Sequence, residues 1–143
     1  MFKYYYGVTL IELMIALLVL SILVVLAYPS YQSQMTENRR TDGKKILLEM
    51  MNEQQKFYSR NNTYTTNLVD VDPTIGLGYP DPNGDGTVPS ENNFYLVTSQ
   101  ACTGLTINEC VELTATPVPQ GGQDGDGDLT YTSRNEKSPA THW

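Results

Sequence analysis

Oxygen-bearing side chains at alternate positions are the clearest candidates for metal chemistry in this sequence. Asp81, Asn83 and Asp85 stand two residues apart, and a glycine follows them, as in the calcium-loop pattern D-x-N-x-D-G. Calcium takes six to eight oxygen ligands, and this turn could supply three side chains and the carbonyl of Thr87. The full pattern ends in Glu at its twelfth position, where this chain has Asn92. A calcium site and a solvated turn are therefore both open here.

A second acidic run has the same spacing. Asp124, Asp126 and Asp128 alternate with glycines, which permit tight turns. Three carboxylates without a counter-ion repel one another, which favours a flexible loop or one that binds a metal ion. One calcium ion shared by the two loops is a further alternative. Ca²⁺ is the one cofactor that the sequence suggests.

The two cysteines, Cys102 and Cys110, are eight positions apart, and the chain has a single histidine. This set is too small for a typical zinc site. If this half of the chain lies outside the cytoplasm, a disulfide is the favoured interpretation, and buried free thiols are the alternative.

The sequence does not predict an enzyme. Its histidine, His142, stands beside the C-terminus, where we expect an exposed tail. No Ser/His/Asp or Cys/His set is evident, because both thiols are expected to pair. The glycines lie among aspartates and form no phosphate-binding loop.

An acid near the start of a long apolar run raises a different kind of chemistry. Val8 to Tyr28 is 21 residues long, and Glu12 lies close to its beginning. About 20 apolar residues span a bilayer, and Lys3 before the run favours a cytoplasmic N-terminus. A cleaved secretory signal would have a shorter run and a small-residue cleavage site. Because a carboxylate in a membrane segment is costly, Glu12 is expected to be functional.

The stretch "GVTLIELMIALLVLSILVVLAYPSY" resembles the N-terminal signature of type IV pilins and the related pseudopilins. The resemblance implies that residues 1–7 are a leader, which a prepilin peptidase removes between Gly7 and Val8. Val8 would then be N-methylated, although family members most often begin with Phe. Glu12 falls on the last position of the family's T-L-I-E motif.

The resemblance also suggests a role for Glu12 in assembly. In a filament core of apolar helices, its carboxylate could neutralise the Val8 amine of a neighbouring subunit. Each charge is costly alone at low dielectric and much less so when paired. The pair would set register between subunits more than stability.

The membrane helix is expected to continue to about Tyr58, with a kink at Pro29 or, alternatively, an end there. Gly43 is expected to weaken this helix locally, because glycine is a poor helix former. Beyond Pro29 the residues at 3–4 spacing form an amphipathic stripe expected to pack on a core. The stripe consists of Leu47, Met50, Gln54 and Phe57, with Met51 and Tyr58 beside it.

A small sheet is expected to follow a long loop at 67–93. Strands are predicted at 93–100, 110–118 and 127–134, and residues 103–109 could extend a hairpin. The fold class is therefore α+β, with a long helix packed on an antiparallel sheet of three or four strands, as the resemblance to pilins implies. The expected divisions are a leader at 1–7, a membrane helix at 8–28, its amphipathic half at 29–60 and a globular domain at 61–143.

The formal net charge is −7, and basic residues gather only at Arg39, Arg40, Lys44 and Lys45. This group could be a solvated helix face or a contact for acidic patches of neighbouring subunits. Binding of DNA is the least favoured alternative, because no aromatic residues are interleaved with these charges. No nucleic-acid partner is expected.

The leading hypothesis is a minor pilin of the PilE-like group, which the segments "YSRNNTYTTNL" and "ELTATPVPQGGQ" and the terminal "HW" also resemble. PilE-like pilins often have cysteines near the end, and none follows Cys110 here. The resemblance implies an inner-membrane protein that joins an extracellular pilus used in assembly, twitching motility, adhesion or DNA uptake. Its partners would be other pilins, the prepilin peptidase and the assembly platform. The alternatives are a major pilin, a pseudopilin of a type II secretion system and a signal-anchored periplasmic binding domain.

Overall fold

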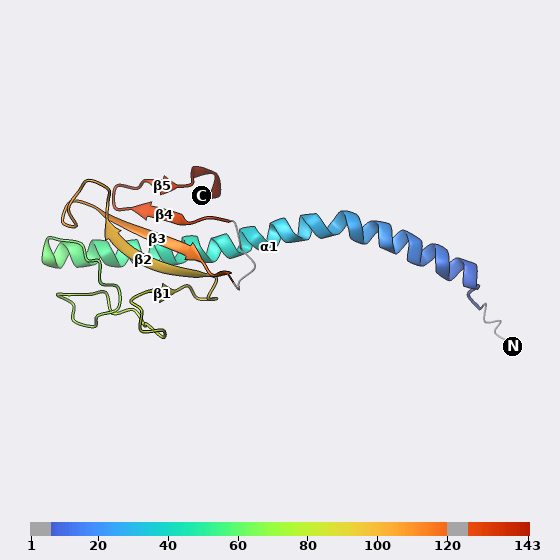
Figure 1. The fold of residues 1–143 in the computed structure, drawn as a ribbon, viewed down its shortest axis with the longest axis horizontal. Coiled ribbons are helices and arrows are strands. Elements are labelled where there is room, and N and C mark those ends of the chain that lie inside the picture. Colours follow the sequence, from blue (N-terminus) through green and yellow to red (C-terminus); the bar gives the residue numbers. More distant parts are fainter. Residues whose placement is uncertain (1–6, 120–125) are drawn as a thin grey trace, which may run out of the picture. The chain divides into compact units, whose positions relative to one another are not determined.

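The computed structural model describes residues 7–119 and 126–143, which form a long helix and a five-stranded sheet (Figure 1). Helix α1 runs from Leu10 to Asn61. Thr9 caps its start, because its hydroxyl accepts a hydrogen bond from the Glu12 N–H at 3.4 Å. Asn62 ends it in the left-handed conformation that is common after helices. The expectation of one long helix is confirmed, with ends two or three residues from those predicted.

Helix α1 is continuous through Pro29, so the alternative in which this residue ends the helix is wrong. The kink expected there stays a prediction. The chain divides into two compact units between Glu37 and Asn38. The amphipathic half of α1 from Asn38 onward therefore belongs to the same unit as the sheet, whereas the sequence analysis separated them at residue 60.

The first unit contains the apolar half of α1. Within the described residues, one helix is long and apolar enough to cross a membrane, and it is this one. Within the described residues its large side chains are exposed to solvent: Leu10 is 78% exposed, and the leucines, isoleucines and valines that follow are exposed as well. A surface of this kind needs a bilayer or other subunits to cover it.

The second unit contains an antiparallel sheet in the order β1-β2-β3-β4-β5. The predicted strands at 93–100, 110–118 and 127–134 correspond to the three central strands. The two strands at the sheet edges were not predicted. The bounds are Val88–Pro89 for β1, Tyr95–Ala101 for β2, Val111–Pro117 for β3, Leu129–Thr132 for β4 and Lys137–Ser138 for β5. Residues 103–109 form turns rather than an extension of the β2–β3 hairpin.

The core lies between α1 and the sheet, and Figure 1 shows the strands lying along this half of the helix. Alternate residues of β3 are fully buried, as expected for a strand with one face on a core. The predicted stripe of α1 packs against these residues from the other side of the core. The prediction that this part of α1 is an amphipathic helix is therefore confirmed. The buried members are Leu47, Met50, Met51, Gln54 and Phe57 from α1 and Val111, Leu113 and Ala115 from β3.

Gln54 is the polar member of this stripe, and it fixes the segment that follows the helix. Its side-chain N–H donates to the Thr65 carbonyl at 2.6 Å, and its side-chain oxygen accepts from the Thr65 N–H at 3.0 Å. Burial of an amide is tolerated when its hydrogen bonds are made. The returning chain is thereby held against α1.

Candidate functional site

The segment Gly7–Glu12 lies at the exposed start of α1. The spacing Thr9-x-x-Glu12 is that of a helix capping box, of which the hydroxyl half is formed. An acid in the first turn also interacts favourably with the positive end of the helix dipole. Glu12 therefore has a local role that the sequence analysis did not consider. Its predicted pairing with the amine of another subunit involves a second chain and stays a prediction.

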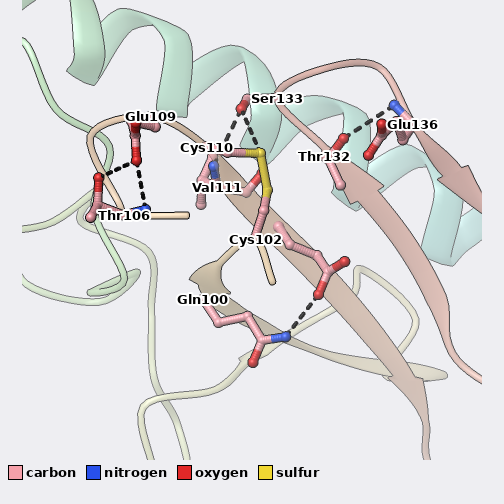
Figure 2. The surroundings of a disulfide bond; sticks show 10 residues. Gln100, Cys102, Thr106, Glu109, Cys110, Val111, Thr132, Ser133 and Glu136 are labelled. Carbon is pink, nitrogen blue, oxygen red and sulfur yellow. Dashed lines mark hydrogen bonds between the residues drawn. A yellow bond between two sulfur atoms is a disulfide. The ribbon is translucent and has the colours of Figure 1, made fainter. Parts of the chain in front are cut away.

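The disulfide predicted from the sequence is confirmed, since Cys102 and Cys110 are bonded with their Cα atoms 5.4 Å apart. It closes the loop between β2 and β3. Figure 2 shows Ser133, which follows β4, beside this bond. The Ser133 hydroxyl accepts from the Val111 N–H at 3.2 Å and lies 3.5 Å from the Cys110 sulfur. The C-terminal segment, which has no cysteine of its own, is thus hydrogen-bonded to the disulfide loop.

The first acidic loop is a turn whose carboxylates are occupied by its own backbone. Asp81 accepts hydrogen bonds from the N–H groups of Asn83, Gly84 and Gly86. The bond from the Gly86 N–H is the main cause that lowers the pKa of Asp81. Asp85 likewise accepts from the N–H and hydroxyl of Thr87. These oxygens therefore cap a turn.

No group of three or more His, Cys, Asp or Glu side chains within residues 7–119 and 126–143 is arranged to hold a metal ion. Calcium also takes amide and carbonyl oxygens, which the loop at Asp81, Asn83 and Asp85 would have to supply. Of the second predicted calcium run, Asp124 lies outside the described residues and Asp128 is exposed. Calcium binding stays a prediction, and we derive no step from it.

Asp126, the middle acid of that run, has a counter-ion, so the expectation of three unpaired carboxylates is wrong for this residue. Arg40 from α1 donates to it from Nε at 2.8 and 2.9 Å and from its terminal nitrogen as well. The Tyr95 hydroxyl donates to it at 3.1 Å. Its side chain is only 4% exposed, and the bond from Arg40 is the main cause that lowers its pKa. Asp126 therefore ties the segment before β4 to the helix.

The basic group on α1 is also engaged inside the chain. The Arg39 guanidinium lies 5.2 Å from the centre of the Phe94 ring. Lys45 forms an exposed ion pair with Glu91, which raises the pKa of the lysine. With Arg40 bound to Asp126, most of this group neutralises acids or packs on a ring. The predicted contact with acidic patches of neighbouring subunits stays a prediction.

A cluster that the sequence analysis missed lies at the C-terminal edge of the sheet. The rings of Tyr131 and Trp143 have their centres 5.5 Å apart. The Lys137 ammonium lies 5.4 Å from the centre of the first ring and 4.8 Å from that of the second. The expectation of an exposed tail is wrong here, because His142 and Trp143 are half-buried.

The sequence contains the members of this cluster, a tyrosine, a lysine and a tryptophan, within its last thirteen residues. Their meeting depends on the β4–β5 register, which pairs Tyr131 with Lys137, and on the 3-10 helix Ala140–His142, after which Trp143 follows. Neither feature has a periodic pattern that could be recognised in the sequence.

Comparison with known proteins gives two family matches. Residues 29–130 match the model of the type IV minor pilin ComP, DNA uptake sequence receptor. Residues 2–28 match the prokaryotic N-terminal methylation motif. A search of curated proteins gives no match.

A solved structure, that of a type IV pilin from Shewanella oneidensis, is similar in fold. It has a TM-score of 0.50 and 19% identity, over 76% of this chain and 97% of that one. This likeness confirms the predicted α+β pilin fold.

The matches also place the protein in the cell. The methylation motif and the exposed apolar half of α1 anchor it in the inner membrane before it enters the pilus. The pseudopilin and the signal-anchored binding domain have no match among these findings. Since the minor-pilin model covers more than two thirds of the sequence, the chain belongs to the ComP family of type IV minor pilins.

Proposed function

We propose that this chain is a minor subunit of a type IV pilus that binds DNA during uptake. The observation that carries the proposal is the family match over residues 29–130, because that family is described as a DNA uptake sequence receptor. The matched range includes the second half of α1 and the strands β1 to β3.

The proposal replaces the expectation of no nucleic-acid partner. That expectation depended on the net charge of −7 and on the absence of aromatic residues near Arg39–Lys45. Net charge governs long-range attraction, whereas binding needs only a local surface that meets phosphates. An acidic pilin can therefore hold DNA at a basic patch, with an affinity that falls as salt rises.

We further propose the route by which the subunit reaches the filament. A prepilin peptidase cuts between Gly7 and Val8, and the new amine of Val8 is methylated. Residues 8–28 lie in the membrane and later in the filament core, where Glu12 faces the amine of a neighbouring subunit. Residues 29–60 and 61–143 form the part that lies outside the bilayer. The partners are other pilins and the assembly platform, and the role is structural and binding rather than enzymatic.

Two measurements test the function. Deletion of the gene from the bacterium that carries it is expected to leave pili visible by electron microscopy while DNA uptake falls by orders of magnitude. Purified full-length protein in detergent is expected to bind labelled DNA in a salt-dependent way. Uptake at the wild-type frequency in the deletion strain would overturn the proposal. So would a protein that retains no more labelled DNA than an unrelated acidic membrane protein in the same detergent.

A further inference from the structure

We propose that Tyr131, Arg134, Lys137 and Trp143, here called the C-terminal cluster, contact the sugar–phosphate backbone and base faces of DNA. This inference depends on the proposed function and assigns its binding surface. The cluster lies after residue 130, where the match to the minor-pilin model ends. It is therefore a property of this chain that the family match does not imply.

The cluster is built in advance, because each ring is held at two points. The Tyr131 hydroxyl donates to the Asn135 side chain at 3.1 Å, and the Trp143 ring N–H donates to the Ser138 carbonyl at 3.3 Å. Both rings also pack against the hydrophobic core. A site whose side chains are already ordered loses less entropy when it binds.

Sheet register places this cluster at the margin of the core. Tyr131 lies opposite Leu113 on one side and opposite Lys137 on the other. Residues directly opposite each other share a face, so all three are on the face that packs on α1. Strand β5 is the edge strand, and the C-terminus lies beside it (Figure 1). The rings are thus anchored on their inner side and reach the surface on their outer side.

The charge of Lys137 is available to a ligand, whereas three other basic residues are already paired with acids. Arg40, Lys45 and Lys56 each form an ion pair with a carboxylate of this chain. Within the described residues, Lys137 has no carboxylate partner, and its ammonium rests over two ring faces. A cation–π contact at an exposed site is worth only about 0.5–1 kcal/mol, so a phosphate can readily replace it.

Arg134 lies in the turn between β4 and β5 and is exposed. Acids are also nearby: Glu136 is exposed in the same turn, and the pKa of Glu109 is lowered mainly by the hydrogen bond from the Thr106 N–H, with a smaller contribution from the charge of Arg134. The Glu109 carboxylate accepts hydrogen bonds from the N–H and hydroxyl of Thr106, and no direct ion pair joins it to Arg134 within the described residues. A lysine over two rings, with an arginine in the adjoining turn, offers the kinds of group that bind phosphate and stack on sugars or bases.

Trp143 is the single tryptophan of the chain, so its fluorescence reports on the cluster directly. Full-length protein in detergent is titrated with a labelled DNA duplex and, separately, with one of its strands. Anisotropy of the label measures binding, and tryptophan emission measures contact with the cluster. Binding is expected to quench or shift this emission. A preference for the single strand would assign the rings to base stacking, and equal binding would assign them to the sugar–phosphate backbone.

The variant Lys137→Gln is expected to weaken binding several-fold. It is also expected to make the plot of log affinity against log salt concentration less steep, by the amount that about one phosphate contact contributes. Trp143→Ala is expected to weaken binding by about 5- to 160-fold, the range for loss of one stacked base. Trp143→Phe keeps a ring and is expected to retain most of the affinity, which separates stacking from folding. Lys56→Gln removes the same charge from an exposed face of α1 and is expected to leave binding unchanged.

The outcomes separate this inference from the function on which it depends. If wild-type protein binds DNA but Lys137→Gln and Trp143→Ala bind equally well, the cluster is not the contact, and the receptor function stands. If binding leaves the tryptophan emission unchanged, the cluster is likewise excluded. If wild-type protein shows no salt-dependent binding, both the inference and the proposed function are overturned.

Discussion

Gly43 of α1 lies directly against the ring of Tyr95, so that a Cβ atom at this position would come within 2.9 Å of the Tyr95 Cδ2 atom. The same Cβ would lie 3.1 Å from a methyl carbon of Leu129. Both neighbours are fully buried, and the Tyr95 hydroxyl is bonded to Asp126. The glycine that looked like a weak point of the helix is therefore a place where helix and sheet approach too closely for a larger side chain.

Replacement of this glycine by alanine is expected to destabilise the second unit, although alanine is the better helix former. The gain in helix propensity is about 1 kcal/mol, whereas overpacking a filled core costs about 1–3 kcal/mol. Thermal unfolding followed by the emission of Trp143 measures the balance. Asn52→Ala, at an exposed position of the same helix, is the control and is expected to raise the midpoint slightly. A higher midpoint for Gly43→Ala would show that the ring can move aside.

The ion pair of Arg40 with Asp126 predicts a pH dependence of stability. The pKa of Asp126 lies below its ordinary value in the folded state. At pH values between its folded and its unfolded pKa, the folded protein therefore binds fewer protons than the unfolded chain. The stabilisation is present above about pH 4 and is lost as the pH falls through the folded pKa.

Asp126→Asn is expected to lower stability at neutral pH by about 1–3 kcal/mol, below the roughly 3–5 kcal/mol of a fully buried pair, because Arg40 is 21% exposed. The difference from wild type is expected to shrink as the pH is lowered toward 3, while Asp128→Asn, at an exposed position, follows wild type throughout. A difference that does not change with pH would contradict the assigned role.

Gln54 gives a further test of the core. Gln54→Leu keeps the volume but leaves the Thr65 N–H without its partner, which is expected to cost about 1–3 kcal/mol. The Thr65 carbonyl keeps a bond from the Ser99 hydroxyl at 3.0 Å, so the loss is limited to one buried group. Gln55→Leu, at the neighbouring exposed position, is the matched control. Equal unfolding midpoints for the two variants would mean that Gln54 serves only to fill space.

The parts of the fold that local pattern determines could be predicted. The long helix, its buried stripe and the strands β2, β3 and β4 follow from the periodicity of apolar residues. The disulfide follows from two cysteines in a segment outside the cytoplasm. Strands β1 and β5 have two residues each and exist only because a neighbouring strand pairs with them, so no period could mark them.

Long-range contacts could not be predicted. Arg40 and Asp126 are 86 positions apart in the sequence, and only the packed sheet brings them together. The acids at Asp81 and Asp85 show that one spacing fits two structures, because spacing that suits a calcium loop also suits carboxylates that cap their own turn. The C-terminal cluster has no local pattern either, because its rings and Lys137 meet only through the pairing of β4 with β5 and the turn that follows.

Glu12 provides the test of assembly. Glu12→Ala is expected to insert in the membrane at the wild-type level but to enter filaments at least tenfold less, since an unpaired buried amine costs about 3–5 kcal/mol and 1.4 kcal/mol is a factor of about ten. Immunoblots of membrane and sheared-filament fractions measure both steps. Glu12→Asp keeps the charge and is expected to restore part of the incorporation. Wild-type incorporation of Glu12→Ala would refute the charge pair.

The variant Glu12→Gln distinguishes that pair from the capping role of the same residue. Glutamine serves in a capping box as glutamate does, so it keeps the helix start that Thr9 and residue 12 define. It has no charge with which to neutralise an amine. If Glu12→Gln is excluded from filaments as strongly as Glu12→Ala, the carboxylate acts through its charge. A loss of tenfold or more would exceed the roughly 0.3–1 kcal/mol of its interaction with its own helix dipole and would assign that charge to a neighbouring subunit. If Glu12→Gln assembles as wild type does, Glu12 acts on its own helix, and the contact between subunits has to be sought among the exposed apolar side chains that follow it.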